Sequence, residues 1–411
     1  MTTMERPGTD LGSEYNDLTE RQREFVARAA AHADDFATRA AEHDREATYP
    51  FENIQKLHES GYMRMCLPEQ FRGEDASVLE LCLSQERLAQ GCAATALAAN
   101  MHAFFSGGAS EAYRHGEKAV EMALMAIGHG GLTGGGAISE VESSDPFSFP
   151  AGRVERCDGG FRLNGRKVFG SNTPINPMVF FSGALEENGT KTVVMFQFPK
   201  ETPGVKIIDD WDTMGMRGTG SFTVEFKECV VPEMFALQSW PYASGLEEND
   251  FSRTFLCWFA PSIAAVYTGI AVGARDYVRR SVGAKTRLPF GEVKHSPAIQ
   301  YNIADMFIEV EAMRSFVRRT ATRLSDDSFR GVDAVALAQG TQQFCTSTAV
   351  SVLDRALEVA GGGGYFKRTP LERMYRDVRA GKFHPLPHYD ALELIGKSEL
   401  GIPTSQDPRF L

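Results

Sequence analysis

The chain has 411 residues, 43% of them hydrophobic, and a formal net charge of −11 with a pI near 5.4. This length suffices for two or three structural regions around a large core, and the acidic balance argues against nucleic acid as a partner, because phosphate binding needs a concentrated basic surface. Seven widely spaced cysteines without a Cys-x-x-Cys pair favour buried thiols in a reducing cytoplasm over a disulfide frame or a metal site.

The N-terminal third of the sequence is predicted to be helical after a short terminal segment, which we call the lead. Residues 1–17 are polar, predict a disordered lead, and contain no signal-peptide stretch. Because no apolar run of membrane length is evident either, we expect a cytoplasmic protein without a membrane partner. Apolar residues then recur at steps of three and four over 18–43, 51–60, 78–88 and 93–105, which predicts a helical domain over residues 18–127. His102, on the last of these helices, is either a satisfied core histidine or a residue at the rim of a cavity.

The pattern changes to strands over residues 128–240. Short runs rich in Val, Phe and Ile are separated by Gly, Asn, Pro and Asp, and Asn164-Gly165 is a hairpin signal. Residues 192–198 form an apolar run and residues 221–226 alternate with period two. These features predict a middle β domain in which Ser139 and Ser171 are, on the residues alone, ordinary strand or turn serines.

Long helices are predicted again over residues 241–411. A Gly- and acid-containing linker at 241–252 precedes one long Ala-rich helix over 255–282, where Gly269 and Gly273 permit close packing. Four glycines, Gly361 to Gly364, then end a helix and allow close approach of another molecule. A new helix starts with Thr369 and Pro370, and Arg373, Arg376 and Arg379 follow at a spacing of three, which by charge alone is typical of a solvated basic face.

The C-terminal motif resembles the acyl-CoA dehydrogenase superfamily. The run Gly-Gly-x-Gly-Tyr, followed by Leu-Glu-Arg-x-Tyr-Arg-Asp-x-Arg, is similar to the C-terminal signature of that family, and similar segments span about residues 60–397. The resemblance implies an α+β fold with a helical N-terminal domain, a middle β-barrel or sandwich domain and a C-terminal four-helix bundle. It also implies FAD, with FMN as an alternative cofactor, and a homotetramer or dimer in which subunits share the nucleotide site.

Cofactor-binding residues are implied by the same resemblance. Ala137–Glu140 resembles a flavin strand, Asn164–Ser171 resembles the next one, and Arg287-x-x-Phe-Gly resembles the segment that reaches a neighbouring subunit's nucleotide. Glu358 stands where Gln usually precedes the glycines, and it would repel a pyrophosphate unless it turns away or pairs with an arginine. The implied cofactor residues are Ile138, Ser139, Phe169, Ser171, Arg287, Phe290, Glu358, Gly361 and Gly362.

The usual catalytic carboxylate is missing from its usual place. The family's dehydrogenases use a Glu nine residues after the Arg of the Arg-Asp pair, and here that position is Pro385. A branch of the family places its Glu at the start of the first C-terminal helix, where Glu247, Glu248 and Asp250 lie in what otherwise reads as a charged linker. Monooxygenases of the same fold lack the Glu and carry a His after the Arg-Asp turn, a second His and a hydroxyl residue, which correspond to His384, His102 and Ser171.

Three functions stay open at this point. The first, which the sequence favours over the other two, is α,β-dehydrogenation of an acyl thioester carried by CoA or a carrier protein, with an electron-transfer partner. The second is a flavin-dependent monooxygenase that acts on N, S or C with reduced flavin from a separate reductase. The third is a non-catalytic flavin-binding protein.

Overall fold

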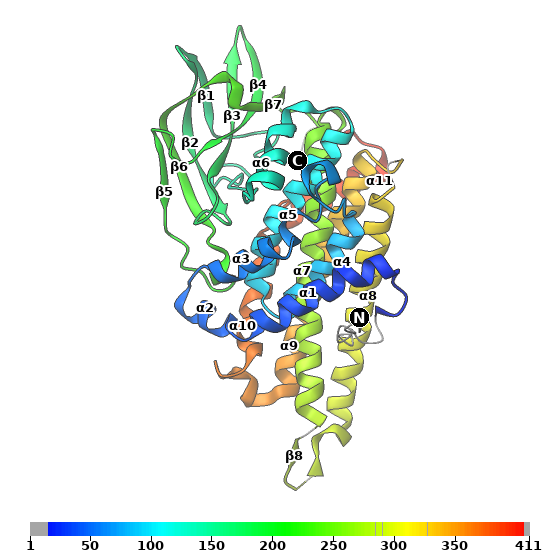
Figure 1. Ribbon diagram of the computed structural model, residues 1–411. Coiled ribbons are helices and arrows are strands. Elements are labelled where there is room, and N and C mark those ends of the chain that lie inside the picture. Colours follow the sequence, from blue (N-terminus) through cyan, green and yellow to red (C-terminus); the bar gives the residue numbers. More distant parts are fainter. Residues whose placement is uncertain (1–14, 284, 290, 327, 407–411) are drawn as a thin grey trace, which may run out of the picture.

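The computed structural model describes residues 15–283, 285–289, 291–326 and 328–406. Most of the predicted lead therefore lies outside the described residues. The prediction is wrong for its end, because Tyr15 is 2% exposed and its hydroxyl donates to Glu86 Oε1 at 3.3 Å. The chain forms an N-terminal helical part, one β-sheet and a C-terminal helical bundle, which is the predicted α+β fold (Figure 1).

The helical parts follow the predicted periodicity. Capping boxes begin two of the N-terminal helices, with Thr19 before α1 and Ser77 before α4. The N-terminal helices are α1 (Glu20–Ala37), α2 (Ala40–Glu46), α3 (Phe51–Glu59), α4 (Val78–Ala89), α5 (Ala93–Arg114) and α6 (Glu121–Gly130). The C-terminal ones are α7 (Asp250–Gly283), α8 (Pro297–Leu324), α9 (Val332–Ala360), α10 (Pro370–Asp377) and α11 (His388–Leu400), and the short hairpin β8–β9 (Thr286–Arg287 and Gly291–Glu292) joins α7 to α8.

The middle domain is one seven-stranded sheet in the order β5-β6-β2-β1-β3-β4-β7. Its strands are β1 (Arg153–Cys157), β2 (Gly160–Gly170), β3 (Met178–Glu187), β4 (Thr190–Pro199), β5 (Val205–Ile208), β6 (Phe222–Val231) and β7 (Ala236–Pro241). Phe181 of β3 and Phe226 of β6 are not on neighbouring strands, yet their ring centroids lie 4.9 Å apart. The sheet is therefore curled around its own aromatic core.

The first predicted flavin strand is not a strand. Residues 131–140 have no regular secondary structure, and residues 128–130 still belong to α6. The segment is nevertheless fixed against the sheet, because the Ser139 carbonyl accepts a hydrogen bond of 2.8 Å from the Val168 amide of β2.

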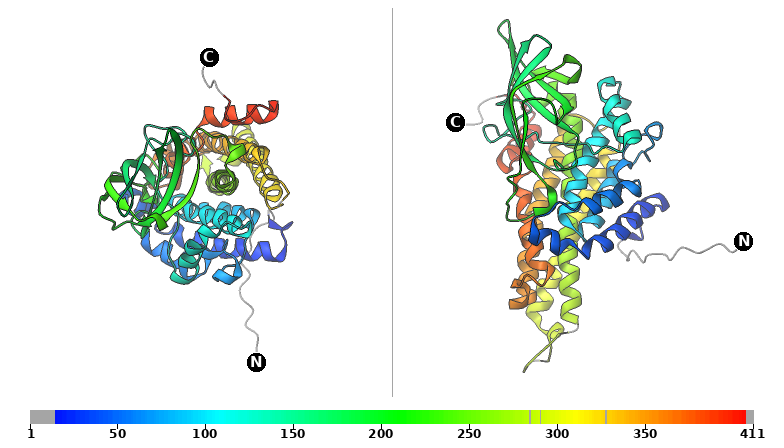
Figure 2. Two further views of the ribbon diagram at one scale, coloured as in Figure 1. Left: turned by 90° about the horizontal axis from the view of Figure 1, so that it is seen from above. Right: turned by 60° about the vertical axis from the view of Figure 1, so that its left-hand side comes forward.

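Helix α7 is the centre of the molecule. Viewed end-on, it lies at the middle of a ring made by α5, α8 and α9 (Figure 2). By length and composition α7 could cross a membrane, which corrects the expectation that no apolar run is long enough. In its most apolar window, 94% of the helix is buried inside the protein, so its apolar surface is used for packing against the surrounding helices.

Candidate active site

A large cavity lies where the sheet meets α5, the first half of α7 and the segment after α10. Its volume is about 500 Å³ and its wall is mainly apolar. Three large apolar side chains on this wall are strongly exposed, namely Phe169 (52%), Met214 (66%) and Phe383 (73%). Exposed apolar groups around a deep cavity are typical of a small-molecule site. The wall also includes Leu97, Met101, Phe104, Phe105, Phe147, Phe180, Met195, Trp211, Phe251, Phe255, Leu256 and Phe259.

The cavity brings together residues that lie far apart in the sequence and that the family resemblance implies for the site. Ile138 and Ser139 of the irregular segment, Phe169 and Ser171 at the end of β2, and His384 all line it. Pro385 lines it as well, at the position where the usual catalytic Glu is expected. The six residues come from three separate stretches of chain, so the fold converges them on one wall.

Ser171 begins a chain of hydrogen-bonded hydroxyls. Its Oγ lies 2.7 Å from Ser221 Oγ, which lies 2.7 Å from Thr219 Oγ1, and Thr219 donates to the Met216 carbonyl at 3.0 Å. The end of β2 is anchored by Asn172, whose side chain accepts from Tyr49 Oη and donates to the Ala98 carbonyl, both at 2.7 Å. Ser171 is therefore held rigidly between the sheet and α5. Its hydroxyl is hydrogen-bonded to the next hydroxyl of this row, that of Ser221.

Phe169 is held with its backbone in the left-handed region at φ 58°. A bulky residue rarely adopts this conformation, and such strain persists only where surrounding contacts enforce it. Its ring packs edge-on against Trp211, with centroids 5.8 Å apart. This arrangement turns an aromatic side chain from the sheet toward the cavity.

His384 lies on the cavity wall and contacts the central helix. Its Nε2 is 2.8 Å from Tyr267 Oη, and burial lowers its pKa to about 4, so the imidazole is neutral at pH 7. The ring of Phe259 packs edge-on against it at a centroid distance of 6.2 Å. A neutral histidine here offers one N–H donor and one lone pair, and it is a weak base.

The Arg376–Asp377 pair ties the cavity loop to α10. Asp377 is buried and accepts from the Met216 amide at 2.6 Å, and burial raises its pKa to about 6. Arg376 bonds both oxygens of Asp44, at 2.9 and 2.5 Å, and donates to the Met214 carbonyl. The interpretation as a solvated basic face is wrong for this arginine, because its charge is used to fix the 214–216 loop.

His102 does not line the cavity. It is fully buried, its Nε2 donates to the Met63 carbonyl, and its Nδ1 accepts a hydrogen bond of 2.7 Å from the Gly134 amide. Burial lowers its pKa to about 4. Both ring nitrogens are thus satisfied by backbone groups, which agrees with the interpretation as a core histidine and leaves no ring atom for a substrate.

The remaining predicted cofactor residues lie at the opposite end of the bundle. Arg287 is exposed on the β8–β9 hairpin, far from the sheet of its own chain (Figure 1), while Phe290 lies outside the described residues. Glu358, Gly361 and Gly362 are exposed at the end of α9, which stops at Ala360 as predicted and continues as a 3₁₀ turn over Gly361–Tyr365. The Lys285 ammonium lies 3.4 Å from the Ala360 carbonyl and joins the hairpin to this turn.

No carboxylate lines the cavity in the part of the chain that the structure describes. The three acids considered as alternative bases are exposed, and none of them lines the cavity. Glu247 accepts from the Thr404 amide and hydroxyl, at 2.7 and 2.5 Å, and Asp250 pairs with Arg253, while Glu248 is exposed in a short 3₁₀ turn. The interpretation as a charged surface segment therefore fits them.

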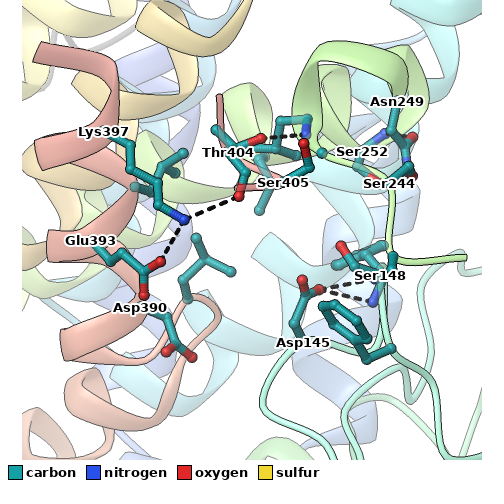
Figure 3. A pocket seen from close by; sticks show the side chains of 18 residues that line it. Asp145, Ser148, Ser244, Asn249, Ser252, Asp390, Glu393, Lys397, Thr404 and Ser405 are labelled. Atoms are coloured by element: carbon teal, nitrogen blue, oxygen red, sulfur yellow. Dashed lines mark hydrogen bonds and ion pairs between the residues drawn. The ribbon is translucent and has the colours of Figure 1, made fainter. Parts of the chain in front are cut away.

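A second, more polar pocket adjoins the cavity. Phe147 and Leu256 line both of them. Figure 3 shows the second pocket between the 145–149 loop, the start of α7 and helix α11, where the Lys397 ammonium lies 2.6 Å from Glu393. Two buried serines on its wall, Ser244 and Ser252, have hydroxyls without a hydrogen-bond partner in the described chain.

Sequence reasoning missed part of the site. Phe251, Phe255 and Phe259 recur every four residues and form one aromatic face of α7 on the cavity wall. This spacing indicates one face of a helix, but the predicted linker at 241–252 includes Phe251. Tyr267, Ser221 and Thr219 gave no local signal, because their partners lie far away in the sequence.

Comparison with known protein families identifies three segments. Residues 19–123, 137–229 and 262–387 match the models described as the N-terminal, middle and C-terminal domains of acyl-CoA dehydrogenase. YdbM of Bacillus subtilis (strain 168), which is provisionally named an acyl-CoA dehydrogenase, is 30% identical over 91% of this chain and 95% of its own. The amino sugar nitrososynthase DnmZ of Streptomyces peucetius is 29% identical over 96% of this chain and 95% of its own.

The fold also matches a solved flavoprotein complex. The structure of KijD3 with FMN and a dTDP-linked amino sugar superposes with a TM-score of 0.83, covers 94% of this chain and 96% of its own, and is 23% identical. At this identity the match establishes the fold alone. The sequence relatives thus carry the names of an acyl-CoA dehydrogenase and of an amino sugar nitrososynthase.

Proposed function

The chain belongs to the acyl-CoA dehydrogenase family, and from this premise we propose that it is a flavin-dependent monooxygenase rather than an acyl-thioester dehydrogenase. As a member of this family it is an oxidoreductase, so the alternative of a non-catalytic flavin-binding protein is set aside. The observation that carries the proposal is the cavity wall at His384 and Pro385, which has no carboxylate among the described residues.

The residues on the wall fit a flavin. A flat aromatic ring system needs apolar contacts on its faces and a few polar groups at its edge, and the cavity offers the exposed ring of Phe169, the side chain of Ile138 and the hydroxyls of Ser139 and Ser171. These four residues would hold the ring. When bound and reduced, a flavin supplies the two electrons that the activation of molecular oxygen needs.

The protein's own groups suit oxygen chemistry better than proton abstraction. Removal of a proton beside a thioester carbonyl needs a base with a pKa near the working pH, and the carboxylate that does this in the family is absent. The neutral His384 can instead donate a hydrogen bond to an oxygen atom in a cavity whose wall also carries the apolar rings of Phe255 and Phe259. The substrate would be oxidised at N, S or C by one atom of O₂.

Several relatives with dehydrogenase names favour the sequence-based expectation of α,β-dehydrogenation. YdbM carries a dehydrogenase name at 30% identity. Dehydrogenation would require a base from elsewhere, for example from the substrate itself, since Glu247, Glu248 and Asp250 do not line the cavity. We therefore place it second.

The assembly we propose is a homodimer or homotetramer. Tyr301, Phe307 and Ile308 of α8 are 69%, 56% and 62% exposed, and Phe344 of α9 lies near Phe316. Such a row of large apolar side chains fits contact with a second copy, in which Arg287 and the glycine turn would reach the partner's cofactor. Light scattering of the purified protein tests this, and a monomer at micromolar concentration would contradict it. We also propose that the enzyme is soluble and cytoplasmic, with a separate reductase as its electron donor.

The test of the proposed function uses the oxygen reaction. The flavin-loaded protein is reduced anaerobically and mixed with oxygen, and oxygen uptake and peroxide release are followed separately. A monooxygenase takes up oxygen at once and releases peroxide only after a delay. Simultaneous uptake and release, or no reaction with oxygen, would contradict the proposal.

A further inference from the structure

Tyr267 is the buried polar group nearest to His384. It lies on the central helix α7, is fully buried, and its ring packs at 66° to the imidazole with centroids 5.5 Å apart. Its hydroxyl lies 2.8 Å from His384 Nε2, which is the only partner of that hydroxyl among the described residues. A tyrosine hydroxyl buried in a helical core is costly unless it is paired, so this contact is a fixed part of the structure.

The direction of this hydrogen bond follows from the protonation of the two groups. Burial raises the pKa of Tyr267 well above its usual value and lowers the pKa of His384 to about 4, so both groups are neutral at pH 7. If Nε2–H were the donor, the tyrosine proton would be left without an acceptor in the described chain. The tyrosine O–H therefore donates to Nε2, and the imidazole carries its proton on Nδ1.

The main chain that carries His384 is held independently of Tyr267. Gln342 Nε2 donates to the Pro385 carbonyl at 3.2 Å. Gln339 accepts from the Leu386 amide at 3.3 Å, and Gln343 donates to the Leu386 carbonyl at the same distance. Three glutamines of α9 thus fix the path of the segment, which leaves the protonation and rotation of the imidazole ring to the tyrosine.

The packing around the tyrosine ring is equally close. A Cβ atom added at Gly381 would lie 3.0 Å from Tyr267 Cε1 and 2.9 Å from Thr346 Cβ, so the chain before His384 can lie against this ring only because residue 381 is glycine. This contact sets the distance between the tyrosine hydroxyl and the imidazole. The tyrosine ring and the histidine therefore form one rigid unit.

We propose that Tyr267 is a positioning residue whose hydroxyl holds His384 in the Nδ1–H tautomer, so that a neutral N–H donor is available at the cavity. The inference rests on the proposed oxygen chemistry, in which an N–H donor stabilises negative charge on oxygen without transferring its own proton. In the described chain Nδ1 has no hydrogen-bond partner, so it is the ring atom that can bond a ligand. Loss of the tyrosine hydroxyl should release the ring to the tautomer with the proton on Nε2.

The test uses Tyr267→Phe, which keeps the ring and its packing and removes only the hydroxyl. The matched control is Tyr277→Phe on the same helix, because Tyr277 is half-buried and makes no hydrogen bond or ring contact with His384 among the described residues. Solid-state ¹⁵N NMR of histidine-labelled, oxidised protein reports the tautomer of His384, which is assigned by the loss of its signals in His384→Ala. We expect the Nδ1–H form in the unmodified protein and in Tyr277→Phe, and the Nε2–H form or a mixture in Tyr267→Phe.

The second measurement is the delay between oxygen uptake and peroxide release. Tyr267→Phe should shorten it by roughly tenfold, as expected for the loss of one well-placed hydrogen bond, while flavin content and melting temperature stay close to those of the control. The double variant Tyr267→Phe/His384→Ala should behave like His384→Ala alone, because the tyrosine acts through the histidine.

The outcomes separate this inference from the proposed function. An unchanged His384 tautomer in Tyr267→Phe overturns the inference, whatever the oxygen reaction does. A changed tautomer with an unchanged delay also overturns it, since the proton position would then be irrelevant to the chemistry. If the unmodified protein shows no delay at all, the proposed function fails, while the tautomer measurement on the oxidised protein still decides whether Tyr267 positions the ring.

Discussion

The molecule contains two histidines with similarly lowered pKa values and different surroundings, of which His102 is fully buried and His384 is partly buried. His102, between α5 and the 131–140 segment, bonds two backbone groups, the Met63 carbonyl and the Gly134 amide. His384, after α10, bonds one side chain, Tyr267, and faces a cavity of about 500 Å³. The pKa of each is lowered to about 4 by burial.

The comparison teaches that a perturbed pKa does not by itself identify a functional histidine. Desolvation acts on both rings alike. What differs is the number of ring nitrogens already used and the access to a cavity. His102 fastens the irregular segment that carries Ile138 and Ser139 to the N-terminal domain, and so it supports the site without touching it.

The largest expected effect separates the two histidines by function. His384→Ala should shorten the delay between oxygen uptake and peroxide release by about 10²-fold or more, as for the loss of a positioned N–H donor that stabilises negative charge on oxygen. His102→Ala, measured on the folded fraction, should leave the delay within about twofold, because no ring atom of His102 reaches the cavity. Equal effects of both substitutions on the delay would contradict the assignment of a direct role to His384 and a structural role to His102.

The stability effects should have the opposite order. His102→Ala leaves the Met63 carbonyl and the Gly134 amide buried without a partner and should lower the free energy of unfolding by about 2–4 kcal/mol. His384→Ala leaves one tyrosine hydroxyl unpaired at the edge of a cavity and should cost about 1 kcal/mol. Urea unfolding of both variants measures this, and a larger loss for His384→Ala would argue against the role given to His102.

The pH dependence of the free energy of unfolding should also include a contribution from His102. The folded pKa is about 4 and the usual value is 6.5, so between these pH values the unfolded chain binds a proton that the folded chain does not. Stability should therefore be complete above pH 6.5 and fall by about 1.4 kcal/mol per pH unit as the pH drops toward 4.

Three other groups near these sites add their own slopes. His384, whose pKa is also lowered to about 4, contributes a slope of the same sign as that of His102. The pKa of His58, whose ring lies 6.4 Å from that of His102, is also lowered by burial, and the raised pKa of Asp377, about 6, contributes a slope of opposite sign. The difference between the unmodified protein and His102→Ala isolates the contribution of His102. A difference that is flat between pH 4 and 6.5 would contradict the assigned shift.

A smaller effect is expected at the hydroxyl chain. Ser171→Ala removes the hydroxyl that pairs with Ser221 Oγ at 2.7 Å and should cost about 1 kcal/mol of stability. If Ser171 also bonds the cofactor, flavin affinity should fall by roughly tenfold, which a fluorescence titration measures. Ser143→Ala is the control, because its hydroxyl donates to the Phe149 carbonyl at 2.7 Å and does not line the cavity.

The smallest effect is expected at the acids near α7. Glu248→Gln and Asp250→Asn should leave the oxygen reaction unchanged within about twofold, because exposed side chains that do not line the cavity contribute little. If either variant abolished turnover with a thioester, that acid would be the missing base and dehydrogenation would move ahead of oxygenation.

Much of the fold was predictable because its signals are local. The helix starts at Thr19 and Ser77 and the end of α9 at the glycine run follow from capping and backbone entropy. The motif around Arg376 and the stretch ending at Ser171 identified the family, and the structure brings Ile138, Ser139, Phe169, Ser171 and His384 to one cavity.

The rest depends on contacts between distant parts of the chain. Tyr267 and His384 are separated by 117 residues, and nothing in the sequence around either one indicates the other. Ser139 looked like a strand residue, but its segment has only one ladder-like bond, from the Val168 amide. His102 could be assigned to the core only once Met63 and Gly134 were seen beside it.

The central claim is that this cavity lacks the base that dehydrogenation requires. Anaerobic titration of the oxidised, flavin-loaded protein with a panel of acyl thioesters of different chain length tests it most directly. The account predicts that the yellow absorbance of the flavin stays unchanged with every thioester. Rapid bleaching by any of them would contradict it, because the chain would then remove a proton and a hydride without the carboxylate.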